Sequence, residues 1–244
     1  MALMTTIGVL DQILAHALRS HPIEACGMVV SHRGEMTASE AVPLRNLAAS
    51  RVAFRFDPSE QLQVVRRLER QNKVCRAIYH SHTASQAYPS RQDLAYANDS
   101  EIHYVIASTW GQALEPIRSF RLRHGTVTEE TISVAGRSAH TAHCLFTHSL
   151  SEQTMSVVAI IPSLFQNLTA NERKVYAQGS TVGQVIDHLE SQFPGLKCKL
   201  VNDKTAHEFI NIYVNERDIR FYDGLNTRTE PGDTLTILPA VAGG

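Results

Sequence analysis

The chain has 244 residues, of which 43% are hydrophobic and 19% are charged, a composition typical of folded globular domains rather than disordered chains. Its formal net charge is -1, so it lacks the basic excess of a nucleic-acid or anionic-membrane binder. No apolar run approaches the roughly 18 residues of a membrane span, and the start lacks the basic segment and cleavage site of a signal peptide. Four scattered cysteines without a CxxC pair favour reduced thiols in the cytoplasm over a disulfide framework.

Hydrophobic spacing in the first half predicts helices alternating with short strands. An amphipathic helix is expected over residues 7–18, with apolar residues three and four apart. Pro58 is expected to open a second helix, and Pro89 a third. Strands are expected over residues 26–30, 36–44, 74–79, 102–108, 116–122 and 126–134.

The composition changes after residue 136, which predicts a domain boundary. Residues 137–153 are rich in Ser, Thr and His and have no sustained period, so we expect a linker there. After it, strands are expected over 155–161, 210–214 and 234–238, with a helix that Thr181 opens and that ends near Pro194. The sequence therefore predicts two α+β domains, residues 1–136 and 154–244.

Two histidines directly after the strand expected over 74–79 are the most informative feature. Residues two apart on a strand point to the same face, so His80 and His82 can direct both imidazoles to one point. Asp93, on the helix that follows, can supply a third ligand. Two imidazoles and one carboxylate suit Zn²⁺ and leave a fourth position open, as in catalytic zinc sites.

The wider pattern H-x-H-x₇-S-x₂-D, with Glu24 upstream, resembles the JAMM (MPN+) family of zinc isopeptidases over about residues 5–135. The resemblance implies a cytidine deaminase-like α/β/α domain in which His80, His82 and Asp93 bind Zn²⁺. It further implies that Glu24 is the general base toward the attacking water, and that Ser90 stabilises the oxyanion. These roles agree with the known chemistry of metal-assisted hydrolysis.

Residues 154–244 resemble the ubiquitin-like sulfur carriers of the β-grasp fold. The resemblance rests on the segment that Thr181 opens, on residues 209–227 and on the ending PGDTLTILPAVAGG. Two glycines without Cβ atoms form a slim tail that can enter a narrow active site. The resemblance implies that an E1-like enzyme adenylates the carboxylate of Gly244, next to Gly243, and converts it to a thiocarboxylate.

The two resemblances together predict a function. JAMM peptidases cut bonds to the carboxyl end of Gly-Gly tails, and this chain carries such a tail. In the thiocarboxylate-dependent cysteine pathway, a carrier–cysteine adduct formed with a cysteine synthase-like enzyme is cut by such a peptidase, so we expect release of cysteine from Gly244. Two alternatives stay open: a deconjugase that removes the carrier from target proteins, and a carrier module that supplies sulfur to a thio-containing metabolite.

Two weaker signals have simpler explanations. His140, His143, Cys144 and His148 crowd the linker and could bind a metal, but solvated histidines are the favoured interpretation. Cys26 could be a nucleophile, but its apolar neighbours favour a buried thiol on a strand.

Overall fold

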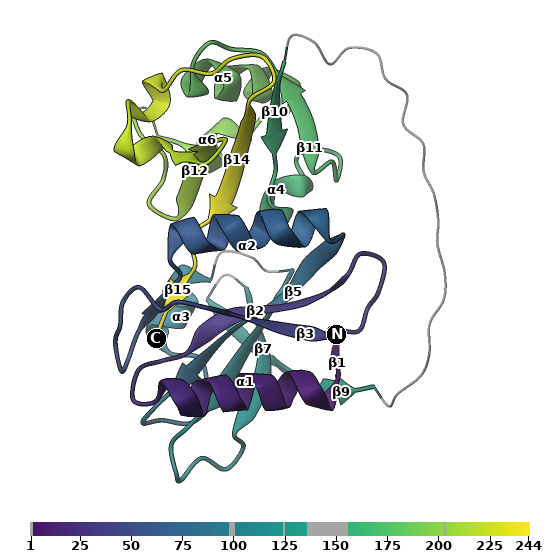
Figure 1. Ribbon diagram of the computed structural model, residues 1–244, viewed down its shortest axis with the longest axis vertical. Coiled ribbons are helices and arrows are strands. Elements are labelled where there is room, and N and C mark those ends of the chain that lie inside the picture. Colours follow the sequence, from purple (N-terminus) through teal and green to yellow (C-terminus); the bar gives the residue numbers. More distant parts are fainter. Residues whose placement is uncertain (1, 98–100, 124, 136–155, 203) are drawn as a thin grey trace. The chain divides into compact units, whose positions relative to one another are not determined.

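The structure is a computed structural model that describes residues 2–97, 101–123, 125–135, 156–202 and 204–244 (Figure 1). These residues form two compact units. One contains the described residues of the N-terminal half together with the last four residues, Val241–Gly244, and the other ends at Ala240. The expected linker, including its histidines and Cys144, lies outside the described residues.

The first unit is built on a six-stranded sheet in the order β3-β2-β5-β6-β7-β8. Strands β5 and β6 are parallel, and the other neighbours are antiparallel. The strands are β2 (Cys26–His32), β3 (Glu40–Leu44), β5 (Lys73–His82), β6 (His103–Ser108), β7 (Ile117–Arg123) and β8 (Thr126–Glu130).

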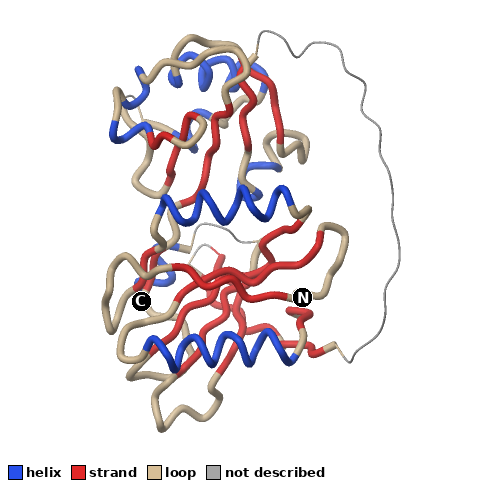
Figure 2. Tube along the Cα trace, in the orientation of Figure 1, coloured by secondary structure: helices blue, strands red, loops and turns tan. Residues whose placement is uncertain are grey.

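Two long helices, α1 (Ile7–Ser20) and α2 (Pro58–Arg70), cover opposite faces of this sheet (Figures 1 and 2). Helix α1 packs its buried face against one core, which includes Val29 and Tyr79, and α2 packs against the other, which includes Met28 and Ile78. Because neighbouring strand residues contribute to opposite cores, the central strands are buried on both faces. The first unit is therefore the expected α/β/α sandwich.

Short elements surround the sheet. β1 (Leu3–Thr5) pairs in parallel with β9 (Ile132–Val134), and α3 (Arg91–Tyr96) follows the loop after β5. β4 (Phe54–Arg55) pairs with β15 (Ala242–Gly243), so the end of the chain adds a strand to the first unit.

Three predicted boundaries are wrong in instructive ways. The third helix begins at Arg91 rather than Pro89, because the Ser90 side chain accepts from the Asp93 amide and makes Ser90 the N-cap. The strand expected over 126–134 is broken between β8 and β9, which pair with different partners. The strand expected over 36–44 begins only at Glu40. The second helix begins at Pro58, as expected, because Asp57 caps it.

The second unit contains a five-stranded mixed sheet in the order β11-β10-β14-β12-β13, with β10 and β14 parallel. Helix α5 packs four buried residues against this sheet and is capped by Thr181, as expected. The strands are β10 (Val157–Ile160), β11 (Lys174–Ala177), β12 (Ile210–Val214), β13 (Arg217–Asp218) and β14 (Thr234–Pro239). The helices are α4 (Ser163–Gln166), α5 (Val182–Gln192) and α6 (Lys197–Leu200), with short 3₁₀ turns at Ile219–Phe221 and Gly224–Asn226.

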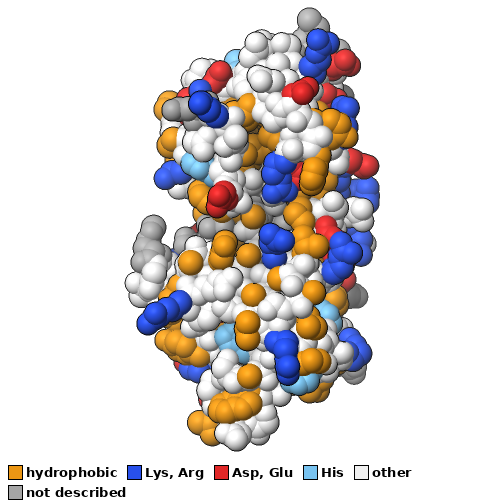
Figure 3. All heavy atoms as spheres, turned by 90° about the vertical axis from the view of Figure 1, so that its left-hand side faces the viewer, with side chains coloured by type: hydrophobic (Ala, Val, Ile, Leu, Met, Phe, Trp, Pro, Cys, Tyr) orange, Lys and Arg blue, Asp and Glu red, His pale blue; other side chains and the backbone are white. Residues whose placement is uncertain are grey.

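The described helices include none that is both long and apolar enough to cross a membrane. On the face drawn in Figure 3, basic side chains lie apart from one another rather than in one continuous patch. This distribution agrees with the balanced charge of the sequence.

Candidate active site

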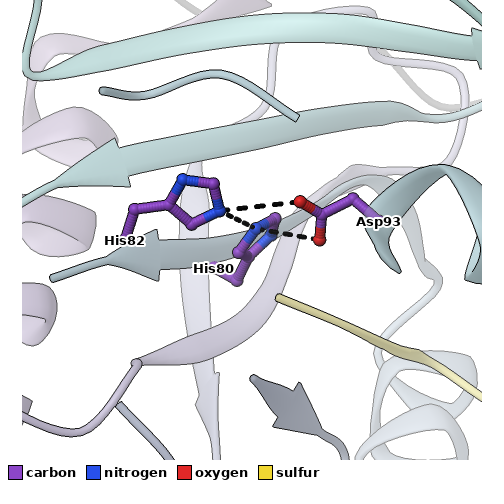
Figure 4. Close-up of side chains that lie close together, drawn as sticks. All are labelled: His80, His82 and Asp93. Atoms are coloured by element: carbon purple, nitrogen blue, oxygen red, sulfur yellow. Dashed lines mark hydrogen bonds and ion pairs between the residues drawn. The ribbon is translucent and has the colours of Figure 1, made fainter. Parts of the chain in front are cut away.

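Strand β5 ends with His80, Ser81 and His82, and this register directs both histidine side chains to one point (Figure 4). Their Nε2 atoms lie 3.1 Å apart, and both side chains are buried. The strand pairs with antiparallel β2 as far as His80 and with parallel β6 through to His82. The two imidazoles are therefore fixed by the centre of the sheet rather than by a loop.

Asp93 reaches the histidines from the first turn of α3 (Figure 4). Its Oδ1 lies 3.2 Å from Nε2 of His80, and its Oδ2 lies 3.5 Å from Nε2 of His82. A reciprocal capping box with Ser90 fixes the helix start: the Ser90 amide donates to Asp93 Oδ2 over 2.7 Å. Burial opposes ionisation of Asp93, but the two histidines and this amide outweigh it and hold the pKa of the carboxyl below its usual range.

The outer nitrogens of the imidazoles face away from this cluster. His82 Nδ1 lies 3.0 Å from the carbonyl oxygen of Gln86, which suits donation from Nδ1 and leaves the Nε2 lone pair for a ligand. The His80 ring is stacked on Phe54 of β4, with centroids 4.5 Å apart. Both rings are thus oriented by contacts outside the cluster.

The cluster fits a tetrahedral metal ion. One ligand atom from each of His80, His82 and Asp93 lies within 4.8 Å of the others. Ligands at zinc distances stand about 3.3 Å apart across a tetrahedron, close to the separations found here. Two nitrogens and one oxygen are a ligand set that zinc accepts with a fourth position open.

Glu24 lies immediately before β2, buried beside the cluster. Its backbone is held by three contacts: its amide donates to Ser50, its carbonyl accepts from Asn46, and the next amide donates to Ser81 Oγ. Its Oε2 has no hydrogen-bond partner among the described residues. Burial raises the pKa of Glu24 to about 8, with a smaller contribution from the charge of Asp93 and an opposing effect of His82. A carboxyl group with a raised pKa is suited to accept and return a proton.

The last residues of the chain enter this site as a strand. Ala242 and Gly243 of β15 pair with Arg55 and Phe54 of β4. The Gly244 amide donates to Asp93 Oδ1 over 2.9 Å, and the Ser90 hydroxyl donates to the Gly244 carbonyl oxygen over 2.6 Å. The terminal carboxyl group is therefore held between the helix start and the metal-ligand cluster.

The tail fits only because its last two residues are glycines. A Cβ on Gly243 would collide with Asp93 Oδ1 and lie 2.8 Å from the Phe54 ring. A Cβ on Gly244 would collide with the backbone of Val52 and Ala53, and Gly244 has a φ of +128°, a conformation that favours glycine. Two positions before Gly243, Val241 is buried in the same core as Phe54 and Phe56 and anchors the strand.

Comparison with known proteins also divides the chain into two parts. Residues 6–123 match the family of prokaryotic homologs of the JAB domain, and residues 156–244 match the ThiS family. The N-terminal part is 41% identical over 124 residues to the CysO-cysteine peptidase of Mycobacterium tuberculosis, covering 51% of this chain and 85% of that protein. The chain belongs to the JAB (JAMM/MPN) family. Its N-terminal domain is a JAMM-type metallopeptidase domain, called the JAB domain below.

The C-terminal domain is a ubiquitin-like sulfur-carrier domain of the ThiS family, as expected. It is 43% identical over 93 residues to the sulfur carrier protein CysO of M. tuberculosis, covering 37% of this chain and 100% of that protein. The JAB domain is also 33% identical over 107 residues to the desampylase of Haloferax volcanii, covering 42% of this chain and 77% of that protein. This chain is thus similar to two separate proteins joined in one.

The structure brings the predicted site residues of the JAB domain together with the predicted tail. These residues are Glu24, His80, His82, Ser90 and Asp93, with Gly243 and Gly244 beside them. Sequence reasoning missed Phe54, although Phe54 and Phe56 alternate with polar residues as a strand requires. Cys26 is fully buried in β2, and burial raises the pKa of its thiol, which confirms the buried-thiol interpretation.

Proposed function

We propose that this chain is a zinc-dependent peptidase that cleaves the amide bond formed by the carboxyl group of Gly244 and thereby releases cysteine from its own carrier domain. The observation that supports this most is the pair of hydrogen bonds that Ser90 and Asp93 make with Gly244. They hold the tail with its carboxyl group at the metal-ligand cluster. The similarity to a CysO-cysteine peptidase and to a sulfur carrier supports the choice of cysteine as cargo.

Zn²⁺ is the ion that the donor set suits, held by His80, His82 and Asp93. When bound there, it would polarise the scissile carbonyl and lower the pKa of a coordinated water. The protein's own contribution is to fix the three ligands on a central strand and a capped helix. The cytoplasm, where the thiols of this chain stay reduced, is the proposed location.

Glu24 is the proposed proton carrier. Its buried carboxylate accepts a proton from the attacking water as the new carbon–oxygen bond forms at the Gly244 carbonyl. It then delivers that proton to the departing amine as the carbon–nitrogen bond breaks. Cysteine leaves with a free amino group, and Gly244 regains its carboxylate. Burial raises the pKa of Glu24 and so makes its carboxylate a stronger base toward the water.

Ser90 is the proposed oxyanion stabiliser. Its hydroxyl donates to the Gly244 carbonyl oxygen in the docked tail, and that oxygen carries the developing negative charge in the transition state. The hydroxyl is held in place because its oxygen also accepts from the Asp93 amide over 3.0 Å. A donor fixed in this way needs no reorganisation during the reaction.

The released Gly244 carboxylate is the group that an E1-like enzyme would adenylate and convert to a thiocarboxylate. A cysteine synthase-like enzyme would then attach the next cargo. Neither a nucleic acid nor a membrane has a place in this cycle. A second candidate function, removal of the carrier domain from lysines of target proteins, is supported by the similarity to a desampylase.

The test uses the whole chain extended by one encoded cysteine after Gly244, because this peptide bond is the bond of the proposed adduct. The extended chain should lose its cysteine after metal loading, as measured by intact-mass spectrometry, whereas the same chain with Glu24→Gln should keep it. A first-order rate that is independent of protein concentration supports cleavage within one chain. A stable extension in the metal-loaded chain would refute the proposal, and selective cleavage of a Gly244–lysine isopeptide would establish the second candidate.

A further inference from the structure

Residues 50–53 form a segment that lines the site from Glu24 to the docked tail. The Ser50 carbonyl accepts from the Glu24 amide over 2.9 Å, and the Arg51 carbonyl accepts from Thr83 Oγ1 over 2.9 Å. The next two residues, Val52 and Ala53, form the wall against Gly244. Ser50 is therefore fixed against the proposed base Glu24, and Arg51 against Thr83. Val52 and Ala53 lie against the tail.

A cargo joined to Gly244 must lie beside this segment. The cargo cannot lie along β4, because Gly243 and Ala242 of the tail are already paired with that strand. The leaving group therefore extends from the carboxyl end of Gly244, whose backbone lies against Val52 and Ala53. Arg51 is the one charged residue of the segment.

Arg51 is available to bind an anion. Its side chain is exposed, and it forms no ion pair within the part of the chain that the structure describes. Other arginines near the tail are placed differently: Arg45 is paired with Asp57, and Arg55 lies opposite Ala242, on the side of the tail away from the cargo. A guanidinium on a long side chain can form two parallel hydrogen bonds with a carboxylate.

The two candidate cargoes differ in this charge. In an adduct with a free amino acid, the α-amino group forms the amide bond and carries no charge. The α-carboxylate then gives the cargo a negative charge, and one carbon separates this group from the scissile nitrogen. In an isopeptide to a lysine side chain, no charge lies near the scissile bond. We infer that Arg51 is a specificity-determining residue that binds the α-carboxylate of an amino acid joined to Gly244. This inference rests on the proposed function and assigns the site to amino-acid adducts rather than protein conjugates.

The experiment compares two cargoes that differ only in charge. Whole chains carrying cysteine or cysteinamide on Gly244 are prepared by ligation, loaded with Zn²⁺, and followed by mass spectrometry under single-turnover conditions. The wild-type chain should release cysteine about fivefold faster than cysteinamide, the size of effect that an accessible ion pair supports. Arg51→Gln should remove this preference by slowing cysteine release alone, and Arg51→Lys should restore part of it.

Arg55→Gln is the matched control, since it removes the same charge on the other side of Gly244. It should leave the preference for cysteine unchanged. An Arg51→Gln chain that keeps the wild-type preference would overturn the inference, as would loss of the preference in Arg55→Gln. Failure of the proposed function is distinguishable, because then the wild-type chain would release neither cargo.

Discussion

The Ser90 hydroxyl group joins two parts of the site, because its oxygen accepts from the Asp93 amide while its proton is donated to the carbonyl oxygen of Gly244. The first contact is an ordinary helix cap. The second gives the same atom a contact with the end of the chain. The cap therefore sets the position of both a metal ligand and the proposed oxyanion donor.

Ser90→Ala removes both contacts. The rate of cysteine release from the extended chain should fall by roughly 10²–10³, as for other oxyanion donors, and loss of the cap should cost about 1 kcal/mol in the free energy of unfolding. Single-turnover mass spectrometry and urea unfolding measure the two effects. Ser90→Thr keeps a hydroxyl and should retain most of the activity. Equal activity of Ser90→Ala and wild type would exclude Ser90 as the donor.

Glu24→Gln keeps the size of the side chain but cannot take a proton from water. Hydrolysis should fall by roughly 10²–10⁴, while the zinc content stays near that of the wild type. Metal analysis by mass spectrometry and the release rate separate the two properties. Loss of zinc together with activity would instead make Glu24 part of the metal site.

His82→Ala removes one of three proposed ligands. The purified wild-type chain should hold about one zinc ion per chain, and the variant should lose most of it. Ser85→Ala is the control, because Ser85 Oγ lies 3.2 Å from His82 Nδ1 but Ser85 is not one of the proposed ligands. Retention of a full zinc equivalent by His82→Ala would show that the ion binds elsewhere.

The unmodified tail should inhibit the site that it occupies. Gly243→Val places side-chain atoms against Asp93 and Phe54, so the tail of this variant should not dock. It should therefore cleave a cysteine-extended Glu24→Gln chain several-fold faster than the wild-type chain does, because a tethered product competes at about millimolar effective concentration. Gly8→Val, at an open position of α1, serves as the control. Equal rates for Gly243→Val and wild type would argue against occupancy by the tail in solution.

The stability of the JAB domain should decline between about pH 6.5 and pH 4 because of His103. Burial is the main cause that lowers the pKa of His103 to about 4, and the charge of Arg121 lowers it further. The charge of Glu130 opposes this shift. The folded domain thus favours the neutral ring, whereas the unfolded chain takes up a proton below its ordinary pKa of 6.5, so acid favours unfolding. The loss should be about 1–3 kcal/mol.

Urea unfolding followed by Trp110 fluorescence measures this loss, since the single tryptophan of the chain lies in the JAB domain. His103→Gln cannot titrate and should flatten the pH dependence over this interval. The same pH dependence in wild type and His103→Gln would assign the acid sensitivity to other groups.

Sequence patterns were sufficient for the features that depend on local spacing. The alternation of a strand places His80 beside His82, and Pro58 and Thr181 mark the starts of α2 and α5. The capping pattern of Ser90 and Asp93 was also present in the sequence and would have placed the start of α3 correctly.

Features that depend on distant pairing could not be predicted in this way. β4 has only two residues, and its partner is the end of the chain, which no local pattern indicates. The exclusion of a Cβ at Gly243 depends on Asp93 and Phe54, which come from two other elements. The burial of Glu24 likewise requires the folded segment around Ser50 and the end of β5.

The pairing of β4 with the end of the same chain also fixes a stoichiometry. A free peptidase can serve a large pool of separate carriers by repeated turnover, but here every carrier is synthesised with its own peptidase. Under the proposed cleavage within one chain, each site receives a new bond only after its own tail has been recharged. Such a chain would gain more from a tail that leaves the site promptly for recharging than from a faster cut.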